Sequence, residues 1–172
     1  FHRNFERILI LHLTTQPRLP LVPGYSGHSH FLQKNLWKCN DQLAELNYER
    51  FAHMDLERQL TPAVLAYEGL AYQYMAPGVM TEDMLSYLQE HLRILSGFYG
   101  VLRPFDGVVP YRLEMQAKLS GTRQMVDLQE KDLYAYWGDL LYQGTRDADG
   151  VFINLASREY ANSSSVRPIW IL

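Results

Sequence analysis

The sequence predicts one domain of the mixed α/β class, a mixed sheet flanked by helices. The chain has 172 residues, of which 47% are hydrophobic and 20% charged, as in an ordinary globular domain. Apolar runs typical of buried strands alternate with segments of helical periodicity. Loops rich in proline and glycine separate them. Together these observations favour a sheet with covering helices over an all-helical or all-strand fold.

The N-terminal segment predicts a strand followed by an irregular loop. Residues 8–13 (ILILHL) form a short apolar run, and residues 14–30 contain three prolines and two glycines. His28 and His30 lie two apart in this loop. No carboxylate or cysteine lies nearby, so a flexible loop is favoured over a metal-binding pair.

A helix is predicted from Asn40, which is a good N-cap residue and is followed by Asp41 in the first turn. Its inner face is predicted from apolar residues at helical spacing, namely Leu43, Leu46, Phe51 and Met54. After it, Thr61 and Pro62 are suited to begin a helix, whereas residues 63–69 (AVLAYEG) suit a short buried strand equally well. Residues 72–78 (YQYMAPG) predict extended chain and a turn.

Two further helices are predicted. The clearer one begins at Thr81 and ends near Ser96 and Gly97, with an apolar stripe of Met84, Leu85, Leu88, Leu92 and Leu95. The other runs from about Glu130 to Gln143, with Gly144 as a left-handed stop. Its predicted inner face consists of Leu133, Tyr136, Trp137, Leu140 and Leu141.

Near the C-terminus, residues 147–150 (DADG) predict a turn, and residues 151–155 (VFINL) predict a central strand covered on both faces. Asn154 lies near the end of that strand, and Ser157 is placed to cap a following helix. Ligands often bind where a buried strand leads into a helix, so Asn154, Ser157 and Glu159 are a candidate site. A capped strand–helix junction with no ligand is the somewhat favoured alternative.

Charge, cysteine content and hydropathy narrow the function classes. The net charge of −3 argues weakly against attraction of the whole surface to nucleic acid or anionic lipid. The single cysteine, Cys39, excludes an intramolecular disulfide and favours a reducing cytoplasm. No apolar run approaches the ~18 residues that a membrane span requires, so no membrane partner is expected. A chain that starts at Phe1 suggests a fragment, a processed chain or a partial reading frame.

No standard catalytic motif occurs. The sequence has neither a phosphate-binding glycine-rich loop nor a nucleophile elbow, which favours a non-enzymatic protein. Cys39 precedes a helix N-cap, where a thiolate can be stabilised, but an inert thiol beside Trp37 is the favoured interpretation. The histidines are scattered, so neither a metal nor a cofactor is expected.

Three arginines interrupt the apolar segment 92–115 (LRILSGFYGVLRPFDGVVPYRLEM), namely Arg93, Arg103 and Arg112. An unpaired buried charge is costly, so they require partners. One interpretation is a structural network with nearby carboxylates, of which the candidates are Asp106, Glu114 and Asp139. The other is a cluster that binds an anion, because guanidinium groups match phosphate and carboxylate geometry. Residue type alone favours neither interpretation.

Several segments together resemble the bacterial peroxide stress protein YaaA family, in a form like that of the Firmicutes. They are LWKCNDQLAELNYERF, LTPAVLAYEGLAYQYMAPG, HLRILSGFYGVLRPFDGVVPYRLEM, KDLYAYWGD and INLASREY. They occur in the family's order and cover roughly residues 36–160 of one YaaA-like domain, 1–172.

The resemblance implies a cytoplasmic protein that supports survival of hydrogen peroxide by limiting free intracellular iron, and so oxidative damage to DNA. It implies a mixed α/β fold with a helix-hairpin-helix-like element in the N-terminal half, which is associated with DNA binding. No enzymatic reaction is attached to the family. DNA is therefore the expected macromolecular partner.

The resemblance also transfers residue positions. The second hairpin helix matches residues 40–50, so Lys38, Asn40 and Gln42 become candidates for contact with DNA phosphates. Candidates for binding a small anion are Arg93, Arg103, Arg112, Glu114, Lys131, Asn154, Ser157 and Glu159. The remaining matches to signature positions are Asp132, Trp137, Asp139 and Tyr160.

Both ends depart from the family. Residues 14–35 diverge and occupy the place of the first hairpin helix, residues 163–172 diverge, and the family's C-terminal part is absent. A truncated or frame-shifted member is therefore expected, with an incomplete sheet, exposed core surface and poor solubility. Three functions remain open: a non-enzymatic peroxide stress protein, an enzyme or binding protein for a small anion or nucleotide, and a non-functional truncated remnant.

Overall fold

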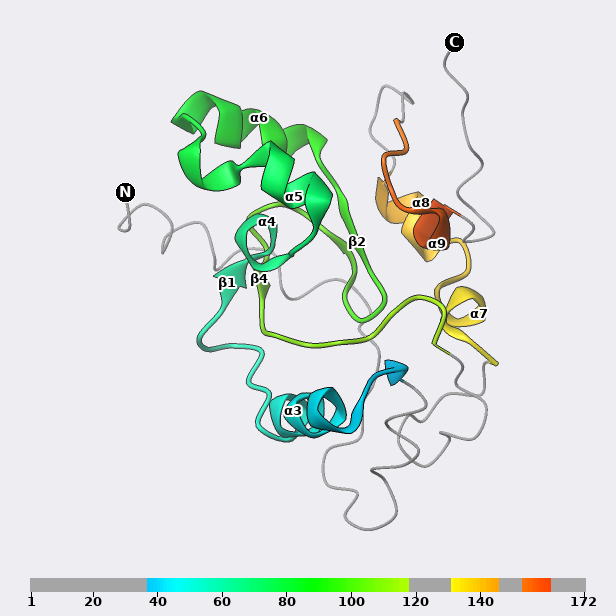
Figure 1. The fold of residues 1–172 in the computed structure, drawn as a ribbon. Coiled ribbons are helices and arrows are strands. Elements are labelled where there is room, and N and C mark those ends of the chain that lie inside the picture. Colours follow the sequence, from blue (N-terminus) through cyan, green and yellow to red (C-terminus); the bar gives the residue numbers. More distant parts are fainter. Residues whose placement is uncertain (1–36, 118–130, 146–152, 162–172) are drawn as a thin grey trace. The chain divides into compact units, whose positions relative to one another are not determined.

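The computed structural model describes residues 37–117, 131–145 and 153–161 (Figure 1). These residues fall into two compact units. The first contains Met54–Ile94 and Leu102–Pro110, and the second contains residues 37–53, Leu95–Val101 and the described residues from 111 onward. Both helices and short strands are present, which confirms the mixed α/β class. The features predicted at 8–13, 14–30 and 147–150 lie outside the described residues.

A small antiparallel sheet organises the first unit. Strand β1 (Thr61–Pro62) pairs with β4 (Gly107–Val108), with Thr61 opposite Val108. The pairing continues past β1, where the backbone N–H of Val64 donates to the carbonyl of Pro104 over 2.9 Å. Helix α4 (Ala63–Ala66) then begins directly after β1. The helical interpretation therefore accounts for α4, and the strand interpretation accounts for the backbone pairing that extends to Val64.

The prediction of extended chain at 72–78 is wrong. Residues Leu70–Met75 form helix α5, and Pro77–Val79 form the short 3-10 helix η1. Between them Ala76 adopts a left-handed conformation with φ 48°, which ends α5 and lets Pro77 begin the next turn. The rings of Tyr67 and Tyr72 stack at a centroid distance of 5.9 Å. Tertiary packing of this kind overrides the weak helix propensity of aromatic residues.

Helix α6 (Glu82–His91) begins as predicted, because the Thr81 hydroxyl accepts a hydrogen bond from the Met84 N–H. It ends earlier than predicted. The chain is already extended at Leu92, and strand β2 (Ile94–Ser96) follows. β2 pairs with β3 (Gly100–Leu102), and the boundary between the two units passes through both strands.

Helix α3 (Asp41–Ala52) belongs to the second unit, and Asn40 caps it as predicted. Its predicted inner face is wrong for Leu43 and Leu46, which are 42% and 46% exposed, whereas the predicted Phe51 does pack against Trp37 and Phe98. The buried positions are Ala44 and Asn47 instead. The helix is therefore rotated so that the side-chain amide of Asn47 is buried, where it donates a hydrogen bond to the backbone carbonyl of Arg112. The first helix of the expected hairpin falls at residues outside the described part.

The single helix predicted over 130–143 is divided into α7 (Leu133–Trp137) and α8 (Leu140–Thr145). Gly138 adopts φ 45° and ψ −125°, a combination open mainly to glycine, and so it ends α7. Gly144 is not a stop, because it lies inside α8. A Cβ atom there would approach Val101 to 3.0 Å, so the glycine permits close packing.

The strand predicted at 151–155 is wrong for its described part, residues 153–155. These residues are irregular, and the side chains of Ile153 and Leu155 are 69% and 85% exposed. A strand needs a hydrogen-bonding neighbour, and no described segment supplies one to them. Helix α9 (Arg158–Ala161) then begins directly after Ser157, as predicted.

Candidate functional site

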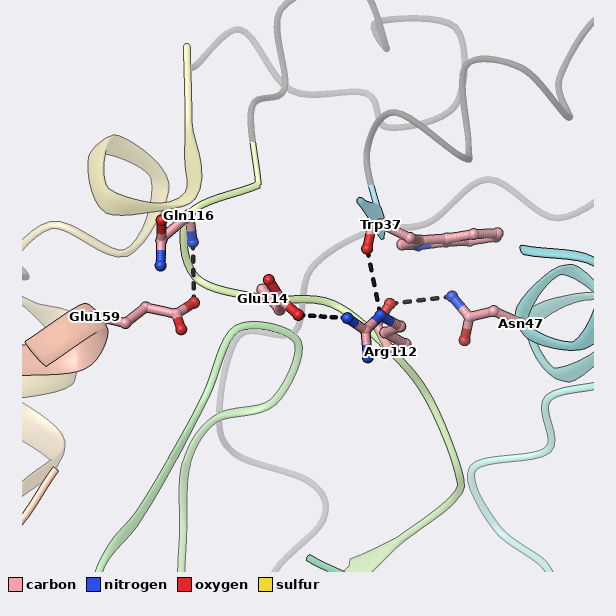
Figure 2. Close-up of polar contacts among 6 residues, drawn as sticks. All are labelled: Trp37, Asn47, Arg112, Glu114, Gln116 and Glu159. Carbon is pink, nitrogen blue, oxygen red and sulfur yellow. Dashed lines mark hydrogen bonds and ion pairs between the residues drawn. The ribbon is translucent and has the colours of Figure 1, made fainter. Parts of the chain in front are cut away.

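A chain of polar contacts in the second unit centres on Arg112 (Figure 2). The Arg112 Nη2 atom lies 2.6 Å from Glu114 Oε1, and both side chains are 39% exposed. The Arg112 Nε atom donates to the backbone carbonyl of Trp37 over 3.3 Å. One arginine thus ties the segment before α3 to residues 111–117, and its charge is balanced by an adjacent carboxylate.

Asn47 joins this network from helix α3. Its side chain is 1% exposed, and its Nδ2 atom donates to the Arg112 carbonyl over 3.0 Å. Its Oδ1 atom has no hydrogen-bond partner among the described residues. A buried amide that makes one such bond fixes the rotation of the helix, at the cost of one unsatisfied acceptor.

Glu159 closes the other end of the network. From α9 its Oε1 atom accepts a hydrogen bond from the backbone N–H of Gln116 over 3.2 Å (Figure 2). The Tyr134 hydroxyl on α7 donates to the Glu159 carbonyl over 2.8 Å. Burial raises the pKa of Tyr134, and the negative charges of Glu159 and Asp132 raise it further. The phenol therefore stays protonated and keeps its role as donor.

Aromatic rings pack around the same segment. Trp37 stacks on Phe51 at 5.6 Å, and Phe51 meets Phe98 edge to face at 5.8 Å. Tyr111 packs against Phe98 and Tyr99, each at a centroid distance of 5.4 Å. The arginine network is therefore bordered by a cluster of packed aromatic side chains.

Ser96 fixes the tip of the β2–β3 hairpin inside this cluster. Its Oγ atom accepts hydrogen bonds from the backbone N–H groups of Phe98 and Tyr99, and it lies 2.6 Å from the Tyr111 hydroxyl. Ser96 is fully buried, and its Oγ atom is occupied by these three contacts. Its role is to hold a turn, not to act as a nucleophile.

The glycines of the hairpin allow it to approach Trp137. The indole Nε1–H of Trp137 donates to the Gly97 carbonyl over 2.9 Å. A Cβ atom on Gly100 would lie 2.8 Å from the Trp137 ring, and Gly100 has φ +79°. Two independent constraints, backbone conformation and contact, therefore require glycine at this position.

The three arginines singled out in the sequence are divided between the units. Arg93 and Arg103 belong to the first unit, and Arg112 belongs to the second. Arg93 donates to the carbonyls of Glu90 and Leu92 over 2.8 and 2.9 Å. Arg103 is exposed, and its backbone N–H donates to Asp106. The ion pair of Arg112 with Glu114 agrees with the predicted structural network of arginines and carboxylates. A joint anion-binding cluster of the three arginines stays a prediction.

The other predicted ligand residues have local contacts. Asn154 Oδ1 accepts from the Ala156 N–H over 3.0 Å, and the Ser157 carbonyl accepts from the Tyr160 N–H over 3.0 Å. Lys131 is exposed at the start of the segment that leads into α7. The contacts of Asn154 and Ser157 suit an irregular segment that leads into α9, and they do not require a ligand.

The predicted DNA-binding residues lie around the start of α3. Lys38 and Gln42 are exposed, and Lys38 has a positive φ of 45°. Asn40 is already engaged, because its Oδ1 atom accepts from the Leu43 N–H over 2.9 Å. Asp41 occupies the first turn, where its carboxylate competes with a phosphate for the helix N-terminus.

Sequence reasoning missed Asn47 and the contact of Gly100 with Trp137. A signal for the first existed, because Ala44 and Asn47 each lie one position after Leu43 and Leu46 and have the same helical spacing to Phe51 and to each other. No local signal could have identified the second, since Gly100 and Trp137 are far apart in the sequence.

Within residues 37–117, 131–145 and 153–161, no group of three or more His, Cys, Asp or Glu side chains is arranged to hold a metal ion. In the same residues, no helix combines the length and the apolar character that crossing a membrane would need.

The sequence of this chain matches a known protein family. Residues 28–169 match the family described as peroxide stress protein YaaA. A UPF0246 protein of Pediococcus pentosaceus is 59% identical over 135 residues, which are 78% of this chain and 51% of the relative. UPF0246 proteins of Lachnoclostridium phytofermentans and Desulfitobacterium hafniense are 56% and 52% identical, over 74% and 83% of this chain and 48% and 59% of the relatives.

The chain belongs to the peroxide stress protein YaaA family, because the family match covers most of its length. This confirms the resemblance noted in the sequence, including its similarity to proteins of the Firmicutes. The chain spans about half the length of the curated relatives it matches.

Proposed function

We propose that the protein acts in the cytoplasm as a non-enzymatic component of the hydrogen peroxide stress response. It limits free intracellular iron and so protects DNA from oxidative damage. The observation that carries this proposal is the family match over residues 28–169. Arg112 is paired with Glu114 and donates to the Trp37 carbonyl, which supports a structural rather than a catalytic role for the segment 92–115.

Survival of peroxide tests the proposal. The chain is expressed in a bacterium that lacks its own member of the family, and colonies are counted after exposure to hydrogen peroxide. Survival above that of cells with an empty vector is expected, with the full-length Pediococcus relative as the positive control. If the relative restores survival and this chain does not, the proposal fails for this chain and the non-functional remnant is favoured.

DNA contact at the start of α3 is the second part of the proposal. The exposed side chains of Lys38 and Gln42 support it, whereas Asp41 opposes it. Affinity for duplex DNA should fall steeply as salt rises, because binding through phosphates releases counterions. Lys38→Ala should weaken binding uniformly across sequences, and Arg58→Ala, at an exposed basic residue outside α3 and outside the candidate sites, is the matched control. Affinity that is insensitive to salt would contradict contact through phosphates.

A small anionic ligand is the alternative, and the exposed Arg103 favours it. Thermal unfolding in the presence of phosphate, nucleotides or iron chelates provides the test. If one of these raises the unfolding temperature, Arg103→Ala should abolish that rise without changing the unfolding temperature of the free protein. A rise that survives the substitution would exclude Arg103 as the ligand residue.

A further inference from the structure

Helix α6 carries apolar side chains on two of its faces. On one face Leu85 is buried, and the Gln89 Oε1 atom accepts a hydrogen bond from the Phe105 N–H over 2.9 Å. That face therefore packs on its own unit. On another face Met84 and Tyr87 are 51% and 64% exposed. A helix that is apolar on more than one side is normally covered on more than one side.

The exposed face is shaped as well as apolar. Met84 and Tyr87 on α6 and Met80, in the extended segment just before it, line an open groove of about 320 Å³, together with Asp83 and Leu88. Methionine side chains adapt readily to the surface of a partner. The groove therefore has the composition of an interface, with apolar walls and a single carboxylate at its edge.

Other large apolar side chains of the first unit are exposed in the same part of the sequence. On α5, Leu70 and Tyr74 lie four residues apart and are 71% and 86% exposed, and Val79 in η1 is 86% exposed. Single exposed apolar residues need no explanation, but a run of them through three consecutive helices does.

Charge restricts what can cover this face. Helix α6 carries Glu82, Asp83 and Glu90, against one basic residue, His91. In a symmetric dimer the groove would meet itself, so the Asp83 carboxylates of the two copies would come close together and repel one another. The phosphates of nucleic acid are disfavoured for the same reason. The occupant should instead present an apolar surface with basic residues at its rim.

The relatives of this chain extend well beyond the segment that matches it. Three relatives that share 59%, 56% and 52% identity with this chain match it over only 51%, 48% and 59% of their own length. The rest of each relative lies outside the segment that matches the given sequence. We propose that the α6 groove face, defined by Met80, Asp83, Met84, Tyr87 and Leu88, is the docking surface for that other part of the family domain.

Carbene footprinting tests this directly, because the reagent labels any accessible side chain. The chain and the full-length Pediococcus relative are labelled in parallel, and the peptide covering residues 80–88 is compared with the aligned peptide of the relative. Labelling per residue should be at least about threefold lower in the relative, since a packed interface excludes the reagent. The exposed segment around Arg58 is the internal control and should be labelled similarly in both proteins.

Each outcome decides the matter. Equal labelling of the 80–88 peptide in the two proteins overturns the proposal. Labelling of this chain that falls with rising concentration, together with a doubled mass in sedimentation, overturns it in favour of a second copy.

As a second measurement, lysine is placed in the relative at the position aligned with Tyr87. That substitution should lower its unfolding temperature, whereas Ser86→Lys and Tyr87→Lys in this chain should leave the unfolding temperature unchanged. An unchanged relative would also contradict the docking surface.

Discussion

At the residue scale, the segment 92–115 is explained by packing. Its glycines admit Trp137 against the hairpin, and Ser96 holds the turn between them. Arg112 is held between Glu114 and the Trp37 carbonyl. Of the three arginines in this segment, Arg112 thus has structural contacts on two sides, and the predicted anion site stays a prediction. That gives a sharp expectation for substitutions.

Gly100→Ala should destabilise the fold by about 1–3 kcal/mol, because the new methyl group would overlap Trp137 at a backbone conformation that alanine resists. Urea unfolding monitored by tryptophan fluorescence measures it. Gly69→Ala separates the two causes, since Gly69 has φ +134° but no atom within 4 Å of its Cβ position. Gly78→Ala, with open space and no positive φ, is the neutral control. Equal effects of all three would contradict close packing at Gly100.

The pair Arg112–Glu114 should show a coupling free energy of about 1 kcal/mol in a double-mutant cycle of alanine substitutions at low salt. The half-buried position and the 2.6 Å contact favour a measurable value. The matched control is Arg58–Asp55, whose atoms are 3.9 Å apart and whose arginine side chain is 84% exposed, so its coupling should be close to zero. Coupling that is equal in the two pairs would contradict a structural role for Arg112.

Tyr72 should make stability depend on alkaline pH. Burial, and then the neighbouring Tyr67, raises its pKa from 10.0 to about 12. The folded state thus prefers the neutral phenol, so this contribution is complete below about pH 10 and is lost as pH rises toward 12. Urea midpoints measured from pH 9 to 12 should fall less steeply in Tyr72→Phe than in the unmodified chain. Parallel curves would exclude Tyr72 as a source of the loss.

At the element scale, capping determines where α3 and α6 begin. Asn40, Thr81 and Asp132 each accept a hydrogen bond from the backbone N–H three residues later, ahead of α3, α6 and α7. The same Asn40 side chain was a candidate for DNA contact. A single substitution can distinguish its two roles.

Asn40→Ala should cost about 1 kcal/mol of stability, whereas Asn40→Ser should retain the cap and most of that stability. Thermal unfolding measures both variants. If Asn40 acts only as a cap, Asn40→Ser should also leave any DNA affinity unchanged. A loss of affinity in a variant of full stability would assign the amide a direct contact with DNA.

The sequence predicted the starts of α3 and α6, because capping is a local signal read over three residues. It did not predict the rotation of α3, since burial of Asn47 depends on a carbonyl 65 residues away. It also missed the break at Gly138, where conformation and not periodicity ends α7. The partners of Arg112 were predicted only where they are near in sequence, as Glu114 is and Trp37 is not.

At the scale of the whole molecule, the main features are the division into two units and the length relative to the family. The described residues form two compact units, and the chain spans about half the length of its curated relatives. Large apolar side chains are exposed on α5 and α6, and at Ile153 and Leu155. The activity of such a chain has to be measured against a full-length relative.

Free iron inside the cell tests the central claim most directly. Cells that lack their own family member are treated with hydrogen peroxide, and chelatable iron is measured by electron paramagnetic resonance with this chain, the Pediococcus relative or an empty vector. The proposed function predicts that this chain lowers chelatable iron below the empty-vector level. Iron that stays at that level with this chain, while the relative lowers it, would contradict the claim.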